Sequence, residues 1–260
     1  MSTTAGEQRV AVVTGASSGI GEATARELAR RDWHLVLLAR REDRLRAVAE
    51  ELGAEWELCD VGDRAAVDRV ASTVLERHPR LGLLVNNAGV PGRGRFVDVD
   101  PETIERVMRI NYFGGIWCQR AFLPGLQAHG DAHVVNVVSV AGTISFAPAG
   151  PYSASKHAQL AFSRSTAAAL AGTGGRVHSV LPGFVETEGF PQRAVLQSRL
   201  MRRFVIDAPR VAEAVADAVD KGRREVTVPW FPYRFVSLAQ ALTPGLVARF
   251  IGMSRQRGEP

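Results

Sequence analysis

The chain is poor in cysteine. Among its 260 residues only Cys59 and Cys118 are cysteines, and neither stands in a CxxC pair or near a histidine at metal-ligand spacing. This scarcity excludes a disulfide framework and leaves no zinc motif, so we predict no metal site. Because paired cysteines are typical of oxidising compartments, their absence predicts a cytoplasmic protein.

Long apolar runs are also missing. A membrane-spanning helix needs roughly 18 uninterrupted apolar residues, but Pro232, Arg234 and Pro244 interrupt even the most apolar region, near the C-terminus. The first eight residues are small and polar rather than basic and then apolar, so we expect no secretory signal. The sequence predicts a chain that does not cross a membrane.

Charge of one sign is not concentrated in any stretch. The net charge of +5 raises the question of an anionic partner such as nucleic acid or a lipid surface. The arginines of the first half, however, stand among carboxylates, which is typical of solvated helix faces. We therefore expect no nucleic-acid binding.

What the sequence does have is regular alternation. Seven short apolar, β-branched runs are typical of strands: 9–14, 34–39, 55–59, 83–86, 133–139, 177–181 and 225–228. Segments with helical periodicity lie between them: 20–31, 42–52, 64–77, 101–126, 153–170 and 211–221. Apolar strands that are each followed by a helix indicate a parallel sheet covered on both faces. We predict a doubly wound α/β fold with seven parallel strands.

No repeat or low-complexity linker divides the chain, so residues 1–260 are predicted to form a single domain. Two segments depart from the alternation. Residues 188–208 mix apolar side chains with arginines, and we interpret them as an irregular helical lid. Residues 230–253 are aromatic and aliphatic, and form an apolar C-terminal extension after the last strand.

A glycine-rich turn ends the first strand. Residues 14–21 read TGASSGIG and lead directly into a helix. Glycines at this point let the backbone approach a pyrophosphate, and the free amides and dipole of the helix favour its negative charge. The order is GxxxGxG rather than GxGxxG, and a simple turn is the alternative. The position at the end of the first strand favours dinucleotide binding.

The second strand ends in arginine instead of a carboxylate. A carboxylate there would bind the adenosine ribose of NAD, but the sequence has Arg40 and Arg41. The planar guanidinium fits the 2′-phosphate of NADP, and we favour Arg40 for this role. The alternative is that both arginines simply begin a solvated helix, balanced by Glu42 and Asp43. We predict NADP(H) as the preferred cofactor, with NAD(H) also accepted.

Three polar residues suggest proton chemistry. Ser139 closes the fifth strand, and Tyr152 and Lys156 are spaced by four, which places them on one helical face. A nearby ammonium is expected to lower the pKa of a phenol. Tyr152 would then exchange a proton with a carbonyl oxygen, Ser139 would hydrogen-bond that oxygen, and Lys156 would also hold the cofactor ribose. An amphipathic helix with a snorkelling lysine is the alternative for Tyr152 and Lys156.

Taken together, these residues resemble the short-chain dehydrogenase/reductase superfamily. The resemblance covers about residues 9–228 and rests on the motifs at 14–21 and 86–89, on Asn111, Ser139, Tyr152 and Lys156, and on Pro182 and Gly183. It implies a Rossmann-type fold and an NAD(P)-dependent dehydrogenase/reductase that acts on CH–OH groups. One departure concerns cofactor choice: Ser18 stands where many NADP-using relatives have a basic residue.

The resemblance also implies roles for individual residues. Tyr152 is the acid/base, Ser139 orients the substrate oxygen, Lys156 assists, and Asn111 holds a water of the proton relay. Asp60 and Val61 contact adenine, residues 87–89 line the adenosine half, and Thr187 meets the carboxamide. The full set expected to bind cofactor is Gly15, Ser17, Ser18, Gly19, Ile20, Gly21, Arg40, Arg41, Asp60, Val61, Asn87, Ala88, Gly89, Tyr152, Lys156, Pro182, Gly183, Val185 and Thr187.

The substrate is expected to be a small carbonyl or alcohol compound between the nicotinamide and the lid. Candidates for an apolar wall there are Val140, Ala141, Phe146, Phe184, Phe190 and Leu200. They favour an apolar substrate such as a steroid, a long-chain ketone or an aromatic ketone.

Partners and competing functions follow from the same features. The C-terminal extension would pack on the pocket mouth, meet a second subunit or dock on anionic lipid as a peripheral membrane contact. The resemblance implies a homodimer or homotetramer. Two other functions stay open beside the enzyme: a dinucleotide-sensing regulator without turnover, and a peripheral membrane or interaction protein.

Overall fold

The computed structural model describes residues 9–92, 94, 97–145, 149–192 and 201–247. Its centre is a seven-stranded sheet in the order β3-β2-β1-β4-β5-β6-β9, with every neighbouring pair parallel. This confirms the predicted doubly wound fold. The strands are β1 (Val10–Thr14), β2 (His34–Ala39), β3 (Glu55–Leu58), β4 (Leu83–Asn86), β5 (Ala132–Val137), β6 (Gly175–Pro182) and β9 (Glu225–Val228).

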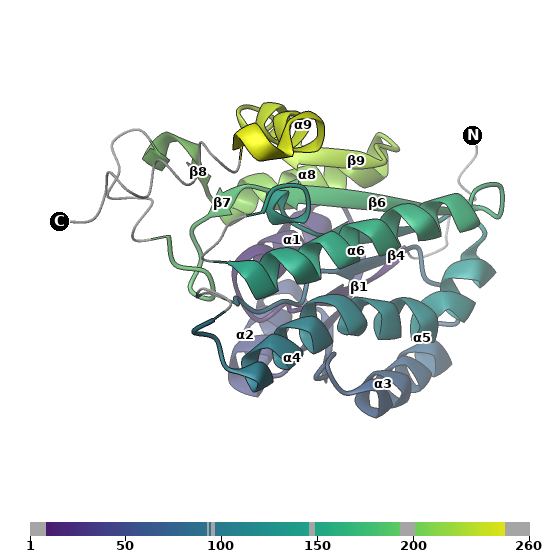
Figure 1. The fold of residues 1–260 in the computed structure, drawn as a ribbon. Helices are drawn as coiled ribbons and strands as arrows, with labels where there is room; N and C mark the ends of the chain where they lie inside the picture. Colours follow the sequence, from purple (N-terminus) through teal and green to yellow (C-terminus); the bar gives the residue numbers. More distant parts are fainter. Residues whose placement is uncertain (1–8, 93, 95–96, 146–148, 193–200, 248–260) are drawn as a thin grey trace.

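Helices cover both faces of this sheet (Figure 1). One face carries α1 (Gly19–Arg30), α2 (Glu42–Leu52) and α8 (Ala208–Asp220). The other face carries α3 (Arg64–Arg77), α4 (Pro101–Met108), α5 (Gly114–His129) and α6 (Gly150–Ala169). No helix in the described ranges combines the length and apolarity that crossing a bilayer requires.

Strand β1 shows why the strands are apolar throughout. Ala11 and Val13 pack in the core beneath α1 and α8, whereas Val10 and Val12 pack in the core beneath α3 and α5. Successive side chains of a strand point to opposite faces, so a strand buried on both faces cannot alternate apolar and polar residues. The continuous apolar runs in the sequence follow from this burial.

The strand order places the site. β1 pairs with β2 on one side and with β4 on the other, so the chain reverses its direction of winding between β1 and β4. In doubly wound sheets such a switch opens a crevice at the carboxyl ends of the strands. The glycine turn after β1 and residues 87–89 after β4 lie at this point.

Three local features differ from the sequence predictions. The helix expected over 101–126 is divided by a π-helical turn, η1 (Arg109–Phe113), between α4 and α5. A small parallel pair, β7 (Phe184–Val185) with β8 (Val205–Ile206), was not predicted. The described ends of the lid contain a 3-10 turn, η3 (Met201–Phe204), and β8 rather than an α-helix, and residues 193–200 lie outside the described ranges.

Candidate active site

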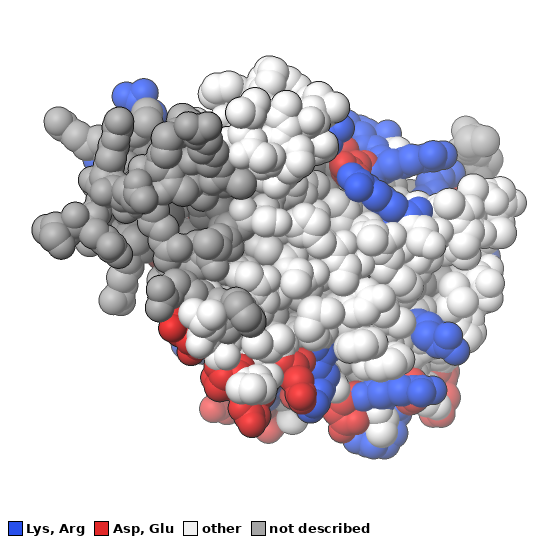
Figure 2. Space-filling view, viewed as in Figure 1, with Lys and Arg blue, Asp and Glu red and all other residues white. Residues whose placement is uncertain are grey.

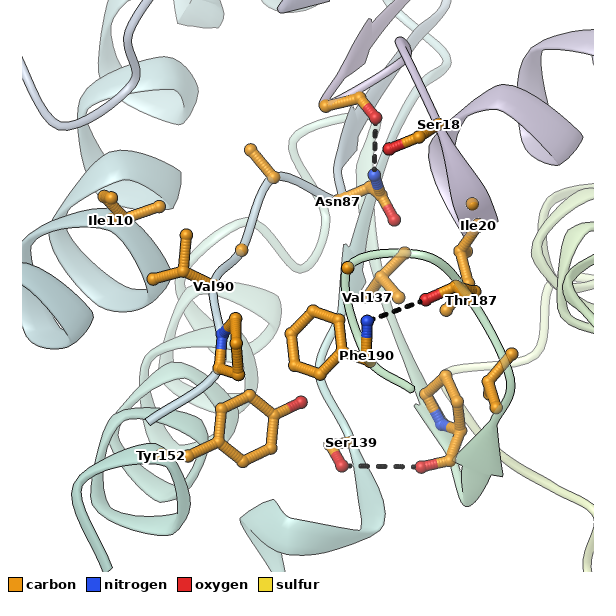
Figure 3. Close-up of a pocket in the computed structure, with 18 of the residues that line it drawn as sticks. Ser18, Ile20, Asn87, Val90, Ile110, Val137, Ser139, Tyr152, Thr187 and Phe190 are labelled. Atoms are coloured by element: carbon orange, nitrogen blue, oxygen red, sulfur yellow. Dashed lines mark hydrogen bonds between the residues drawn. The ribbon is translucent and has the colours of Figure 1, made fainter. Parts of the chain in front are cut away.

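A cavity of about 480 Å³ opens at the switch point (Figure 3). It is lined by the turn after β1, by the ends of β2, β4, β5 and β6, and by the start of α6. Nearly all of the residues expected to bind cofactor line it, as do Ser139, Tyr152 and Lys156. Gly21 and Asn111 are the two expected residues in the described ranges that do not line it. The fold therefore brings together segments that are up to about 170 residues apart in the sequence.

The glycine turn is shaped by close approaches. Gly15 and Gly19 have positive φ angles of 68° and 59°, which glycine adopts without strain. Gly21 lies behind the turn, where a Cβ atom would stand 2.2 Å from the Gly15 carbonyl oxygen. Gly21 thus serves the turn through packing rather than by lining the cavity.

Two polar residues hold this turn against the end of β4. The Thr14 hydroxyl accepts hydrogen bonds from the backbone amides of Asn87 (3.0 Å) and Ala88 (3.1 Å). The Asn87 side-chain amide donates to the carbonyl oxygen of Thr14 at 2.9 Å. At the start of α1, the N-cap residue Ser18 makes no side-chain cap. Amides at an uncapped helix start beside a cavity are suited to a phosphate group.

The two arginines after β2 have different partners at one end of the cavity. Arg40 reaches Asp60 with an Nη1–Oδ2 distance of 3.4 Å. Arg41 donates to the hydroxyl of Ser17 at 3.4 Å and to that of Ser18. Arg41 therefore contacts the glycine turn directly. The sequence had favoured Arg40 for the phosphate role and did not predict this contact. Both guanidinium groups remain about half exposed, with 55% and 47% of each side chain accessible.

Tyr152 and Ser139 lie together on the cavity wall (Figure 3). Tyr152 projects from α6, and Ser139 follows β5, which ends two residues earlier than predicted. Burial raises the pKa of Tyr152 to about 12, while a hydrogen bond with Ser139 acts in the opposite direction. The predicted lowering by Lys156 is thus wrong for this geometry, because burial of the phenol outweighs the effects that favour the phenolate. At neutral pH Tyr152 is a protonated phenol and hence a proton donor.

Lys156 lies one turn further along α6 and is 3% exposed. Its ammonium donates to the carbonyl oxygen of Val137 at 3.1 Å and to Oε1 of Gln159 at 2.8 Å. The Nζ atom lies 5.8 Å from the centre of the Tyr152 ring. Burial lowers the pKa of Lys156 to about 7, so the side chain can gain or lose a proton near neutrality.

Asn111 is buried in the π-helical turn and fixes a neighbouring loop. Its side-chain carbonyl accepts from the Val90 amide at 2.8 Å, and its side-chain amide donates to the Val90 carbonyl at 3.0 Å and to Ser155 Oγ at 3.1 Å. Val90 itself lines the cavity. Asn111 therefore positions the loop after β4 and one face of α6, and its role in a proton relay stays a prediction.

Apolar side chains face Tyr152. Phe190 lies with its ring centre 5.7 Å from that of Tyr152, and its amide donates to the Thr187 hydroxyl at 3.2 Å (Figure 3). Of the predicted wall, Val140, Ala141, Phe184 and Phe190 line the cavity, whereas Phe146 and Leu200 lie outside the described residues. The described part of the predicted wall is apolar near Tyr152.

The C-terminal extension packs beside this wall through α9 (Tyr233–Leu242). The Tyr233 hydroxyl accepts from the Phe184 amide at 3.3 Å and donates to the Phe204 carbonyl at 3.2 Å. The outward side chains are exposed, and the surface over α9 is largely uncharged (Figure 2). They are Trp230, Phe231, Phe235, Leu238, Leu242 and Leu246. Contact with the pocket mouth is thus present, and an apolar outer surface remains.

The contacts of two residues were not predicted from the sequence. Gln159, which accepts from Lys156, was not expected at the site, and Tyr233, which joins α9 to the cavity wall, was expected only as one residue of the C-terminal extension. A polar residue three positions after Lys156 on the same helix was the available signal for Gln159. Tyr233 carried no such signal, because its partners at 184 and 204 are close only in the fold.

Comparison with known proteins gives a consistent assignment. Residues 9–194 match the family model for short chain dehydrogenases. An uncharacterized oxidoreductase of Mycobacterium tuberculosis is 43% identical over 189 residues, covering 72% of this chain and 74% of the relative. An actinorhodin polyketide ketoreductase solved with NADPH has a TM-score of 0.78 and 30% identity, covering 88% of this chain and 97% of that one.

A second solved structure has the other coenzyme. A short chain dehydrogenase/reductase from Burkholderia phymatum, in complex with NAD, has a TM-score of 0.78 and 28% identity, covering 91% of this chain and 95% of that one. The cavity of this chain fits a nicotinamide dinucleotide. The uncapped start of α1 and the two glycines of positive φ line one end of the cavity and suit the phosphates of that cofactor. The chain therefore belongs to the short-chain dehydrogenase/reductase superfamily and is an NAD(P)-dependent oxidoreductase.

Proposed function

We propose that the protein is an NADP(H)-dependent reductase that interconverts an apolar ketone and its secondary alcohol. The observation that carries this proposal is the pairing of a protonated Tyr152 with Ser139 beside the apolar side chains of Val140, Ala141, Phe184 and Phe190 on the cavity wall. A carbonyl oxygen placed between the two hydroxyls accepts a hydrogen bond from Ser139 and a proton from Tyr152. When bound in the cavity, a reduced nicotinamide would supply the hydride for the carbonyl carbon.

The raised pKa of Tyr152 bears on the direction of the reaction. A phenol with a pKa of about 12 stays protonated at neutral pH, which suits the acid needed for carbonyl reduction. The developing oxyanion then takes the proton from Tyr152 while Ser139 stabilises the charge. Alcohol oxidation needs the phenolate and is expected to become faster at alkaline pH.

Lys156 and Asn111 support this step from behind the tyrosine. Lys156, with its pKa near 7, can return a proton to Tyr152 after each turnover and hold the cofactor ribose. Asn111 joins the Val90 loop to Ser155 on α6. The water that it would hold completes a relay from the lysine to solvent.

The preference for NADP(H) rests on the two arginines. Arg40 and Arg41 line one end of the cavity beside Asp60, Ser17 and Ser18, and their exposed guanidinium groups suit a 2′-phosphate. The hydroxyls of Ser17 and Ser18 orient Arg41, so we propose that both arginines contribute. NAD(H) remains a second, weaker cofactor.

The cofactor preference is tested by titrating NADPH and NADH into the parent and into Arg40→Ala, Arg41→Ala and Arg46→Ala. Because a charge-assisted hydrogen bond contributes about 1.5–3 kcal/mol, the first two variants should lose about tenfold or more in NADPH affinity and keep their NADH affinity. Arg46, which pairs with Asp43 on α2 and does not line the cavity, is the control. Equal affinity of the parent for both coenzymes would remove the preference.

The apolar substrate class is tested with a panel of steroids, long-chain ketones and aromatic ketones, monitored by NADPH oxidation. Val140, Ala141, Phe184 and Phe190 form the wall that favours these compounds. The solved relative named a polyketide ketoreductase makes polyketide ketones a further group for the panel. Turnover of small sugars or polyols but of no apolar ketone would show that the substrate class is wrong.

Tyr152→Phe separates the enzyme from a dinucleotide-sensing regulator. Loss of a general acid costs typically 10²–10⁴-fold in rate, so turnover should fall by about that factor while NADPH binding persists. A regulator instead binds NADPH with no turnover in the parent on any member of the panel. Unchanged turnover in Tyr152→Phe would show that another group supplies the proton.

We further propose that residues 1–260 act as one domain, in the cytoplasm, as a homodimer or homotetramer. The exposed apolar residues of α9 support a contact with a second copy or with a lipid surface. Sedimentation and liposome flotation of Leu242→Glu, compared with the parent, distinguish these two partners. Loss of the oligomer favours the subunit contact, and loss of flotation favours peripheral membrane contact.

A further inference from the structure

Three side chains that commonly bind metals lie together at the amino end of the sheet. His34 begins β2, Glu55 begins β3, and His78 follows the last residue of α3. The Nε2 atom of His34 lies 2.8 Å from Glu55 Oε1, and the Nε2 atom of His78 lies 2.7 Å from the same oxygen. One ligand atom from each residue falls within 4.8 Å of the other two. No metal-binding motif marks these residues in the sequence, because the three residues converge only in the folded chain.

The fold explains this convergence. β2 and β3 are paired so that Val36 stands opposite Glu55, and His34 lies two residues before Val36. Because residues two apart in a strand share a face, His34 and Glu55 point to the same face as Val36. That face is covered by α3, whose Val67, Ala71 and Val74 pack with Val36. The end of α3 therefore delivers His78 directly onto the pair.

The partners of Glu55 divide between its two carboxylate oxygens. Arg77 Nε holds the other carboxylate oxygen, Oε2, at 3.1 Å, and Arg77 Nη2 also binds Glu57 at 2.8 Å. This fixes the carboxylate so that Oε1 faces both imidazoles. The side chains of His34, Glu55 and His78 are 21%, 31% and 15% exposed, so the cluster is preorganised but open to solvent.

We propose that His34, Glu55 and His78 form a binding site for a divalent transition-metal ion of the Zn²⁺ class. Two imidazole nitrogens and one carboxylate oxygen are a donor set that suits such ions, with water in the remaining position. Ligand atoms of a tetrahedral zinc ion, bound at about 2.0–2.2 Å, stand about 3.3 Å apart, so the two nitrogens need to move only slightly away from Oε1.

The ion would act on structure rather than on the reaction. The site lies at the opposite end of β2 from the cofactor cavity, roughly 16 Å away by the rise of a six-residue strand. It would tie the edge strand β3 to β2 and to α3. Residues 60 and 61, which follow β3, line the cavity, so the ion would anchor the strand that leads to them.

To test this site, the full chain is first treated with a chelator and then titrated with ZnCl₂ in a calorimeter. The absorption spectrum of the chain with CoCl₂ is an independent measure of binding. The parent is expected to bind one ion per chain and to gain thermal stability. His34→Gln and His78→Gln should weaken binding at least about 100-fold, since losing even an outer-shell partner of a ligand costs about 10–100-fold. His129→Gln, a partly buried histidine outside the cluster, is the matched control and should bind like the parent.

Two results would overturn the site: a parent that binds Zn²⁺ no more tightly than His34→Gln or His78→Gln, or a control that loses binding equally. Circular dichroism and NADPH affinity show whether each variant is folded, because the cluster lies far from the cavity. If a variant does not fold, the CoCl₂ absorption spectrum of the parent is the remaining test of the site. A spectrum that shows only hexaaquo cobalt would mean that the parent does not bind the ion.

Discussion

Polar side chains have different surroundings at the two ends of the parallel sheet. At the amino end, charged groups are paired with one another, as Arg77 is with Glu55 and Glu57. At the carboxyl end, the groups around the cavity include a partly buried phenol with a raised pKa, a buried lysine with a lowered pKa and a helix start without a cap. Such groups are costly unless a ligand compensates them. The groups suited to cofactor and substrate thus lie where the fold leaves polar groups in need of a ligand.

The largest effect that would sharpen this comparison is expected from Ser139→Ala. Removing a hydrogen bond to a developing oxyanion typically costs about 10²–10³-fold in kcat, and NADPH affinity should change little. Steady-state kinetics with the best ketone of the panel measure the effect. Ser153→Ala is the control, because Ser153 is buried on the same helix as Tyr152 and its hydroxyl has no partner among the described residues. A similar loss in both variants would mean that packing, not Ser139, is responsible.

A smaller effect is expected from Gly21→Ala. The new Cβ would stand 2.2 Å from the Gly15 oxygen and 2.4 Å from Asn87 Nδ2, so the turn or the α1 start must shift. Overpacking of this kind costs about 1–3 kcal/mol, and NADPH affinity should fall with it. Gly115→Ala is the matched control, since its Cβ would meet no atom closer than 3.9 Å and alanine favours a helix. Urea unfolding and NADPH titration measure both, and an unperturbed Gly21→Ala would contradict the packing argument.

Next comes the pH dependence of stability caused by Lys156. Burial lowers its pKa to about 7 in the folded chain, below its ordinary value of 10.5. Between these two values the unfolded chain binds more protons, so Lys156 makes stability rise with pH from about 7 to about 10. The slope is at most about 1.4 kcal/mol per pH unit, and Lys156→Met should remove it. If the parent and the variant have parallel pH profiles, the lysine is not titrating in this window.

The smallest effect is expected at the amino end of the sheet, from Arg77→Ala. Its ion pairs with Glu55 and Glu57 are partly exposed, and such pairs contribute about 0–1 kcal/mol. The loss should shrink further in high salt because exposed charges are screened. Urea unfolding at low and high salt measures it. If the free energy of unfolding fell by several kcal/mol, these ion pairs would contribute more to stability than exposed pairs normally do.

Much of the fold was predictable because strands buried on both faces appear in the sequence as continuous apolar runs. β1 and β4 are apolar on both faces, and the turn at 14–21 needs glycine where the backbone is crowded, so both were found from local pattern alone. β7 and β8 were missed because each has only two residues, too few to show a period. The π-helical turn was missed because its five residues are too few to show a period of their own between two α-helices.

The candidate site was predictable as a set of residues but not in its electrostatics. Ser139, Tyr152 and Lys156 line the cavity as expected. The pKa of Tyr152 is raised rather than lowered, because the extent of its burial depends on chain segments distant in sequence. In the same way, the contact of Arg41 with Ser17 and Ser18 depends on how α2 and the glycine turn meet.

Tyr233 connects α9 to the cavity wall, a contact that its position in the sequence does not indicate. Its ring fills the space beside Gly183, where an added Cβ would lie only 2.2 Å away, and its hydroxyl bridges the backbone at 184 and 204. The wall around the substrate is therefore braced by a residue nearly fifty positions downstream. Truncating the tail would alter the shape of the reaction chamber together with the outer surface, so only changes confined to outward side chains can reveal what that surface binds.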